Sequence, residues 1–324
     1  MSLVIGIDAG GTRLRAALAS PEGVLATAAS GAGNPRSVTE AALADHLTEA
    51  IAAVCPPQHA GDVRALAAGF AGARSPSAAD PEPDDPGSRA ARAALATALR
   101  RCGVTGAAVR ITGDIEIALA AGPGGPRDGL VVVAGTGAAA ARIRGGLQVA
   151  AVDGHGWLLG DEGSGFWIAR RGLRAAVRAL DGSGPPTALV RTLVAATGSQ
   201  PDLPAADLRL HLIDAAVAHD PPPRLASLCP VVVRTAEEGD DVAAALLDEA
   251  ANRLLESLTT LRPEPGEPLV TTGGLLGPAG PLLSRFTART AALGVHPHPV
   301  PDGLAGALVL GRSDAGHRAL LPPT

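Results

Sequence analysis

The chain begins with three short apolar runs that are separated by polar turns. The first extends from residue 3 to Asp8, and the others cover residues 14–20 and 24–30, on either side of the turn Pro21-Glu22-Gly23. Short apolar runs bounded by glycine and proline are typical of β-strands. The pattern therefore predicts a meander of three strands at the amino terminus.

Longer segments with apolar residues three and four apart predict helices. Helices are predicted over residues 38–54, with Ser37 or Thr39 as the capping residue, and over 88–101, 166–180, 186–197, 205–218, 241–261 and 302–310. Further strands are predicted over 63–70, 107–112, 130–134, 138–144, 147–152, 268–272 and 294–300. Strands that alternate with helices in this way indicate an α/β fold.

The strand pattern of the amino terminus recurs after residue 129. A strand over 130–134 ends in Gly135-Thr136-Gly137, and two further strands follow it around the turn Gly145-Gly146. Residues 122–129 are rich in glycine and proline, which is typical of a linker between domains. The recurrence indicates an internal duplication of structure, with two related halves that grip one polyphosphate.

A glycine-rich turn follows the first predicted strand and contains Asp8, Gly10, Gly11 and Thr12. Glycines let backbone N–H groups turn toward an anion, and Thr12 adds a hydroxyl donor. Asp8, at the end of the strand, is placed to hold a hydrated Mg²⁺. A plain hairpin turn is the alternative interpretation, but the second glycine turn at 135–137 favours phosphate binding.

Two further segments carry candidate chemistry. Asp114 lies between a predicted strand and a predicted helix, where a carboxylate serves as an N-cap, as a catalytic acid, or as both. Residues 153–165 contain five glycines and three acids in thirteen positions. Because glycine loses the most entropy on ordering, a loop of this composition usually binds a ligand.

Composition excludes several classes of protein. All 27 basic residues are arginines, and the absence of lysine excludes P-loop nucleotidases, protein kinases and pyridoxal enzymes, which each need one. The net charge of −5 gives no basic surface for nucleic acid, and no run of 18 apolar residues predicts a membrane span. Cys55, Cys102 and Cys229 lack the spacing of a disulfide framework or a metal cluster. We therefore expect no nucleic-acid or membrane partner, no signal peptide and a cytoplasmic location.

Five elements stand in the order found in the superfamily of sugar kinases, actin and Hsp70-type ATPases. They are the phosphate turn at 5–12, the helix with Asp114 at 113–119, the second phosphate turn at 133–137, a glycine pair at 272–274 and the small-residue helix at 302–310. Residues 157–168, with their core Leu-Leu-Gly-Asp-Glu-Gly-Ser, closely resemble the signature of the N-acetylglucosamine kinase branch. That branch is grouped with the BadF/BadG/BcrA/BcrD ATPases, and the resemblance covers most of the chain.

The resemblance implies two ribonuclease H-like lobes, as in actin-like ATPases, with a cleft between them. One lobe would comprise residues 1–122 and 304–324, and the other would comprise residues 123–303. It implies ATP and Mg²⁺ as cofactors and an amino sugar as the substrate, and we expect a homodimer. The expected activity is ATP-dependent phosphorylation of an amino-sugar hydroxyl, namely the 6-hydroxyl of N-acetylglucosamine.

The resemblance also implies roles for individual residues. They are Asp8 for Mg²⁺; Gly10, Gly11, Thr12 and Arg13 for the first phosphate site; Gly135 and Thr136 for the second; Gly273 and Gly274 for adenosine; Asp114 as general base; and Asn34, Asp114, Thr136, Gly137, Asp161 and Glu162 for the sugar. Asn34 and Asp161 would come from different lobes, so a bound sugar would favour closure of the two.

Four positions depart from the family pattern. Leu14 replaces a small hydroxyl residue, and His155 stands where tryptophan is typical. Gly113 and Ala139 stand where asparagine is usual. Three of these positions surround the expected sugar site, so they bear on the choice of substrate more than on the chemistry.

Related branches of the superfamily and other functions were also compared with the sequence. The sequence lacks the Cys/His zinc motif of ROK sugar kinases and the bridging cysteines of the activases of 2-hydroxyacyl-CoA dehydratases. A non-catalytic sugar sensor and an ATPase that drives a protein partner remain alternatives. The presence of both Asp8 and Asp114 favours a kinase over a sensor.

Overall fold

The computed structural model describes residues 2–73, 80, 83–218 and 222–314, and the chain folds into two compact units. Unit 1 comprises Met1–Val131, Arg142–Ala150 and Val300–Thr324, and unit 2 comprises Val132–Ala141 and Ala151–Pro299. Both units are discontinuous in sequence. The lobe limits expected from the sequence stay a prediction, and their final residues 315–324 lie outside the described residues.

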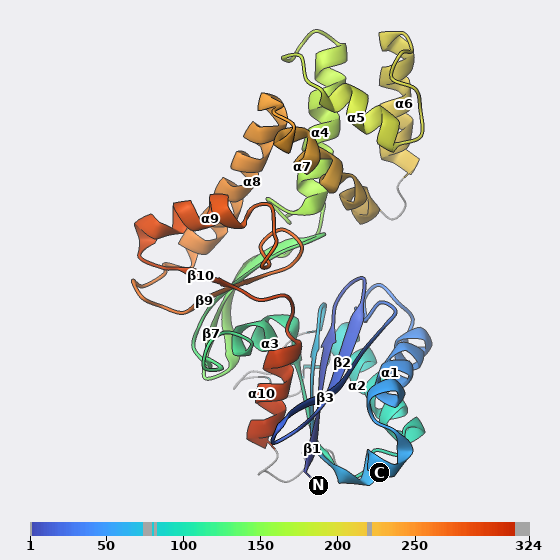
Figure 1. The fold of residues 1–324 in the computed structure, drawn as a ribbon, viewed down its shortest axis with the longest axis vertical. Helices are drawn as coiled ribbons and strands as arrows, with labels where there is room; N and C mark the ends of the chain where they lie inside the picture. The colour runs from blue at the N-terminus through green and yellow to red at the C-terminus, as the bar shows by residue number, and fades with distance from the viewer. Residues whose placement is uncertain (1, 74–79, 81–82, 219–221, 315–324) are drawn as a thin grey trace. The chain divides into compact units, whose positions relative to one another are not determined.

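The sheet of unit 1 contains five strands in the order β3-β2-β1-β4-β5 (Figure 1). The strands are β1 (Leu3–Ala9), β2 (Leu14–Ser20), β3 (Gly23–Ser30), β4 (Val63–Phe70) and β5 (Ala108–Gly113). The first three form an antiparallel meander, as predicted, and β4 and β5 continue the sheet parallel to β1. The carboxyl ends of β1, β4 and β5 therefore lie along one edge.

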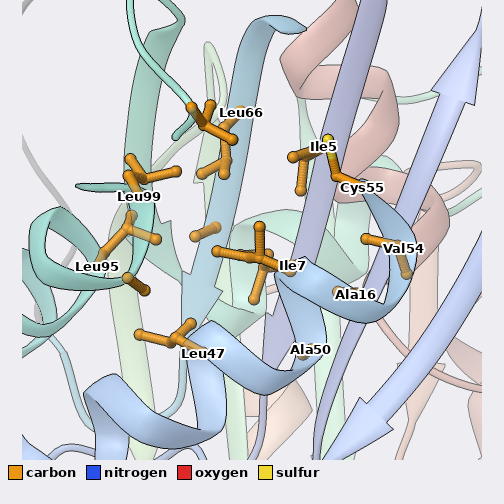
Figure 2. Close-up of a cluster of buried hydrophobic side chains, with 14 of the residues drawn as sticks. Ile5, Ile7, Ala16, Leu47, Ala50, Val54, Cys55, Leu66, Leu95 and Leu99 are labelled. Carbon is orange, nitrogen blue, oxygen red and sulfur yellow. The ribbon is translucent and has the colours of Figure 1, made fainter. Parts of the chain in front are cut away.

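Alternate residues of β1 point to opposite faces of this sheet, and every residue of β1 is buried. Ile5 and Ile7 pack with α1 (Glu40–Val54) and α2 (Pro86–Arg101) in the larger core, where Leu47 and Leu95 are buried (Figure 2). On the other face, Val4 packs against α10 (Leu304–Asp314), which also packs on α3 (Asp114–Ala120). The sheet is thus the middle layer between two pairs of helices.

The second sheet has the order β10-β9-β6-β7-β8. Its strands are β6 (Gly129–Ala134), β7 (Ala138–Arg144), β8 (Leu147–Asp153), β9 (Leu269–Thr272) and β10 (Pro297–Pro299). From β8 to β10, this order matches the order from β3 to β5 in the first sheet, position by position. The structural duplication inferred from the sequence is therefore confirmed.

Helices fill the long interval between β8 and β9 (Figure 1). They are α4 (Gly165–Leu180), α5 (Leu189–Ala196), α6 (Ala205–Ala218), α7 (Cys229–Glu237) and α8 (Asp241–Thr260), and α9 (Leu283–Thr290) follows β9. The sequence did not predict α7, because the prolines at 221–223 indicated a break in the helical region. Pro230 lies in the first turn, where a helix tolerates the missing N–H.

Two other local predictions differ from the structure or are settled by it. The strand expected over 294–300 is only β10, since Gly294 adopts a left-handed conformation and two prolines supply no N–H to a ladder. Thr39 rather than Ser37 caps α1, accepting from the Ala42 N–H at 3.2 Å. No helix among the described residues is long and apolar enough to cross a membrane.

Candidate active site

Asp8 is a buried carboxylate near the end of β1 in unit 1. Its Oδ2 accepts a hydrogen bond from the Gly303 N–H, at the start of α10, at 3.0 Å. Burial raises the pKa of Asp8, and the charge of Asp302 adds to this, whereas the Gly303 hydrogen bond and the Arg15 charge lower it. Arg15 and Asp302 form an ion pair at 3.3 Å. The residues around the Asp8 carboxylate thus come from both ends of the chain.

Asp114 is the first residue of α3, directly after β5. Gly113 is the N-cap, so Asp114 is not the cap that the sequence allowed, although backbone N–H groups of the first turn still bond to its carboxylate. Burial raises the pKa of Asp114 to about 7, with smaller contributions from the charges of Asp8 and Glu116. The structure therefore brings Asp8 and Asp114 together at the edge where β1, β4 and β5 end.

The first glycine turn lies beside these acids. The Gly10 N–H donates to the Arg13 carbonyl at 3.1 Å, and this bond closes the turn. Gly11, Thr12 and Arg13 are exposed. Residues 11–13 therefore lie exposed at the carboxyl end of β1, and their role as a phosphate site stays a prediction.

Asn34 lies close to this turn, because its neighbour Gly33 donates its N–H to the Gly10 carbonyl at 2.9 Å. The Asn34 Oδ1 accepts from the Arg36 N–H at 2.8 Å. The side-chain amide nitrogen is therefore the group that Asn34 has available for a ligand. A Cβ at Gly72 would lie 2.5 Å from the Asn34 Oδ1, so a glycine is required where the next loop passes.

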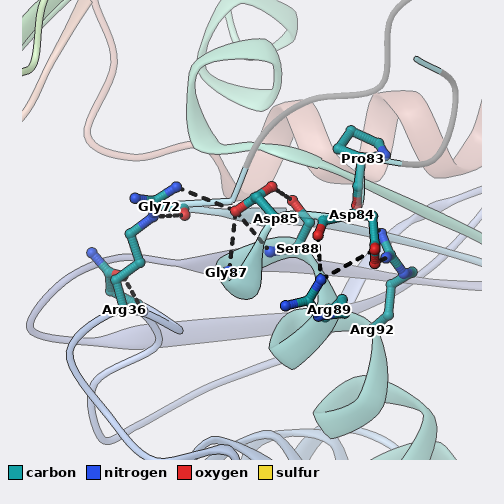
Figure 3. Close-up of polar contacts among 10 residues, drawn as sticks. Arg36, Gly72, Pro83, Asp84, Asp85, Gly87, Ser88, Arg89 and Arg92 are labelled. Atoms are coloured by element: carbon teal, nitrogen blue, oxygen red, sulfur yellow. Dashed lines mark hydrogen bonds and ion pairs between the residues drawn. The ribbon is translucent and has the colours of Figure 1, made fainter.

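Arg36 ties the Asn34 loop to the start of α2 (Figure 3). Its Nε donates to the Gly72 carbonyl at 2.6 Å, and its Nη2 lies 3.2 Å from the Asp85 Oδ1. Asp85 in turn caps α2 through the N–H groups of Gly87 and Ser88. Sequence reasoning missed Arg36 and Asp85, because their importance comes from contacts between distant segments.

The second glycine turn, in unit 2, is held by the start of α4. The Gly165 N–H donates to the Gly135 carbonyl at 2.7 Å, and the Phe166 N–H donates to the Thr136 carbonyl at 3.2 Å. Ser164 caps α4 by accepting from the Trp167 N–H at 3.2 Å. The turn and the first turn of α4 therefore form one backbone unit.

Asp161 lies against this turn. Its Oδ1 accepts from the Ala138 N–H at 3.1 Å, and a Cβ at Gly137 would lie 2.8 Å from that oxygen. Burial raises the pKa of Asp161, and the nearby charge of Asp153 raises it further, whereas the Ala138 bond and His155 lower it. The structure thus brings Thr136, Gly137 and Asp161 together.

Glu162 points elsewhere, although it adjoins Asp161 in sequence. Its carboxylate lies 3.7 Å from the Arg253 Nε on α8. It does not cap α4, which is the role of Ser164. The sugar-binding role expected for Glu162 stays a prediction.

The glycine pair expected to hold adenosine lies beside the second phosphate turn. Gly273 has a φ of 92°, and a Cβ there would lie 2.3 Å from the Ala134 carbonyl oxygen. The Leu275 N–H donates to that same carbonyl at 2.9 Å. Gly273 and Gly274 are therefore in contact with the end of β6, immediately before Gly135.

The donor set of unit 1 fits a hydrated Mg²⁺. Among the described residues, no three His, Cys, Asp or Glu side chains gather in a way that would hold a metal ion. Mg²⁺ usually retains several waters and takes one or two carboxylates together with phosphate oxygens. A single buried carboxylate, Asp8, next to a phosphate-type turn meets that requirement.

Comparisons with known proteins relate the chain to one family. The family model described as the BadF/BadG/BcrA/BcrD ATPase family matches residues 5–311. An N-acetyl-D-glucosamine kinase of Dictyostelium discoideum is 32% identical over 180 residues, which cover 51% of this chain and 52% of that protein. An N-acetylmuramic acid/N-acetylglucosamine kinase of Clostridium acetobutylicum is 31% identical over 148 residues, 46% of each chain. The chain thus spans about half the length of these curated relatives.

A solved structure from Porphyromonas gingivalis, provisionally assigned as an N-acetylglucosamine kinase, superposes with a TM-score of 0.71. The superposition covers 98% of this chain and 99% of the other, at 20% sequence identity. At that identity the likeness establishes the fold alone. The expected fold class, that of sugar kinases and actin-like ATPases, is confirmed.

Proposed function

Because the chain belongs to the BadF/BadG/BcrA/BcrD ATPase family, we propose that it is an ATP-dependent kinase acting on the 6-hydroxyl of N-acetylglucosamine. The main support for this proposal is the pair of acids, Asp8 and Asp114, at the edge of the sheet where β1, β4 and β5 end. One acid suits a metal-bound nucleotide, and the other suits proton transfer. The activities for which the two curated relatives are named support an amino sugar as the substrate.

Asp114 is the proposed general base. A base works best when its pKa lies near the operating pH, and burial raises the pKa of Asp114 to about 7. At neutral pH a large fraction of the enzyme would hold the carboxylate form, which accepts the proton of the attacking sugar hydroxyl. The hydrogen bonds from the first turn of α3 fix the direction of this carboxylate.

The other residues bind and orient the substrates. The N–H of Gly11 and the N–H and hydroxyl of Thr12 would donate to phosphate oxygens, because phosphoryl transfer depends mainly on positioning and on neutralising charge. Gly10, whose N–H closes the turn, would give the phosphate site its shape. Mg²⁺, when bound through Asp8, would supply positive charge to the phosphates. The Asn34 amide and the Asp161 carboxylate are the proposed partners of sugar hydroxyls.

The test is an assay of ADP release with a panel of sugars. The panel comprises glucose, glucosamine, N-acetylglucosamine, N-acetylmannosamine and N-acetylmuramic acid, each with ATP and Mg²⁺, and a reaction without sugar. We expect N-acetylglucosamine to give the largest stimulation, with the phosphate on the 6-hydroxyl by NMR. ATP binding without stimulation by any sugar would favour the sensor, and sugar-independent turnover would favour the partner-driving ATPase.

Three finer expectations accompany this proposal. They are Mg²⁺ as the metal, a homodimer as the assembly and the cytoplasm as the location. Titration with Mg²⁺, Mn²⁺ and Ca²⁺ in the same assay addresses the first, and light scattering of the purified protein addresses the second. All three stay predictions.

A further inference from the structure

Asp153 occupies an unusual position at the end of β8. Its φ is 66°, in the left-handed region that glycine adopts without steric cost. Aspartate tolerates this region better than most residues, because its short side chain bonds to nearby backbone groups. The side chain of Asp153 therefore has a local role that glycine would not fill.

The Asp153 carboxylate accepts three backbone hydrogen bonds. Its Oδ1 accepts from the Gly154 N–H at 2.8 Å and from the Asp161 N–H at 2.6 Å. Its Oδ2 accepts from the Glu162 N–H at 2.8 Å. Two of the three donors lie eight and nine residues further along, so this one carboxylate closes the whole loop 153–162.

The loop is shaped around that carboxylate. A Cβ at Gly160 would lie 2.1 Å from the Asp153 Oδ1, closer than any real contact. Asp161 also has a positive φ, 58°, so its backbone needs outside support to hold that conformation. The Asp153 carboxylate supplies this support, because it accepts the N–H of Asp161 and the N–H of the next residue.

We propose that Asp153 is a positioning residue for Asp161, and that through Asp161 it sets the affinity of the site for the amino sugar. The inference rests on the proposed function for its sugar readout. By fixing the Asp161 backbone, Asp153 aligns the Asp161 side chain with the Ala138 N–H and the turn at Gly137. Asp153 itself uses both carboxylate oxygens on backbone donors, so it acts through another residue.

Three variants separate the carboxylate from the backbone conformation. Asp153→Gly keeps the left-handed backbone without strain and removes the acceptors. Asp153→Asn keeps one acceptor oxygen and tolerates the same backbone. Gly160→Ala keeps Asp153 and displaces its carboxylate. Asp128→Asn is the matched control, because Asp128 also accepts a backbone N–H, that of Gly145 at 2.8 Å, outside this loop.

In steady-state kinetics we expect Asp153→Gly to raise KM for N-acetylglucosamine about tenfold, and KM for ATP less than twofold. KM of Asp153→Asn for N-acetylglucosamine should fall between the values of the wild type and of Asp153→Gly. KM of Asp128→Asn should equal that of the wild type. Combined with Asp161→Ala, Asp153→Gly should have little further effect, since both changes act through the same side chain. Multiplicative effects in the double variant would overturn the proposal.

Amide hydrogen exchange tests the same role without catalysis. We expect the amides of Asp161 and Glu162 to exchange at least about tenfold faster in Asp153→Gly and Gly160→Ala, with α8 unchanged. Unchanged exchange at these two amides would overturn the positioning role, whatever the enzyme phosphorylates. If the wild type used no sugar but the exchange still accelerated, the kinase proposal would fail and the role of Asp153 would stand.

Discussion

The protonation of Asp114 at neutral pH is set mainly by burial. A carboxyl group with an ordinary pKa of 3.8 would be fully ionised there, but desolvation and the charges of Asp8 and Glu116 bring the pKa to about 7. At neutral pH the folded protein therefore holds Asp114 partly protonated and ready to accept or release a proton. Burying this carboxyl group lowers the free energy of unfolding.

Asp114→Asn should lower kcat about 100-fold or more, because it removes the proposed base while nearly preserving shape. KM for the sugar should change little. Asp45→Asn is the control, since Asp45 is an exposed acid that pairs with Arg101 on the surface of unit 1. Near-normal turnover by Asp114→Asn would show that the base is another residue.

The pH dependence of stability should change in the same variant. With a folded pKa of about 7 against an ordinary value of 3.8, the folded state binds more protons than the unfolded state between these pH values. Stability from Asp114 is thus full below the unfolded pKa and is lost as pH rises through the folded pKa. The Tm of Asp114→Asn minus that of the wild type should increase from about pH 4 to pH 7 and then level off. A difference that is constant across this range would contradict the assigned pKa.

Sequence motifs proposed the residues whose side chains or glycine backbones would contact a ligand, and those roles stay predictions. They did not identify Asp153, Arg36 or Asp302. Asp153 acts through donors eight and nine residues away, and Arg36 through Gly72 and Asp85. Such contacts depend on loop conformation and on chain segments that meet only in the fold, which periodicity does not encode.

At the scale of elements, the start of α4 is bonded directly to the second phosphate turn. The N–H groups of Gly165 and Phe166 are used by the carbonyls of Gly135 and Thr136. The Ser164 cap therefore has two functions, since it satisfies a helix N–H and fixes the residues that hold the turn.

Ser164→Ala should lower the free energy of unfolding by about 1 kcal/mol and raise KM for ATP. Thr39→Ala is the matched control, because Thr39 caps α1 through a bond of the same length, 3.2 Å. It should cost similar stability and leave KM for ATP unchanged. Denaturant titration measures the stability of both variants, and steady-state kinetics measures their KM for ATP. If Ser164→Ala and Thr39→Ala had the same KM for ATP, the cap of α4 would be only structural.

The pattern of apolar residues predicted strands and long helices well, and it failed where prolines dominate. The strand over 63–70 and the helix over 205–218 have the predicted bounds. The helix α7 was missed and β10 was overextended. Proline is compatible with a helix start but not with a regular ladder, and only the tertiary structure decides between the two.

At the scale of the molecule, α10 returns the end of the described chain to the sheet that β1 begins. A Cβ at Gly306 would lie 1.8 Å from the Ile117 carbonyl oxygen on α3. The two helices therefore pack backbone to backbone, and α3 carries Asp114. The position of the proposed base depends on a residue almost two hundred positions away in sequence.

Gly306→Ala should destabilise unit 1 by about 1–3 kcal/mol, because the clash is with backbone and one helix must move. A shift of α3 would also lower kcat. Gly61→Ala is the matched control, since a Cβ at Gly61 meets nothing within 4 Å. Thermal unfolding and kinetics check both effects, and identical behaviour of the two alanine variants would argue against close packing of α10 on α3.

The hydrogen bond from Gly303 to Asp8 joins residues that are 295 positions apart. During translation, a nascent chain that has already emerged through β5 still lacks the donor that satisfies this carboxylate. The surroundings of the proposed Mg²⁺ ligand are therefore completed only after residue 303 leaves the ribosome. A chain that ends before that point would lack the Gly303 donor to Asp8 and the cover that α10 gives to one face of the sheet, where α3 alone would remain.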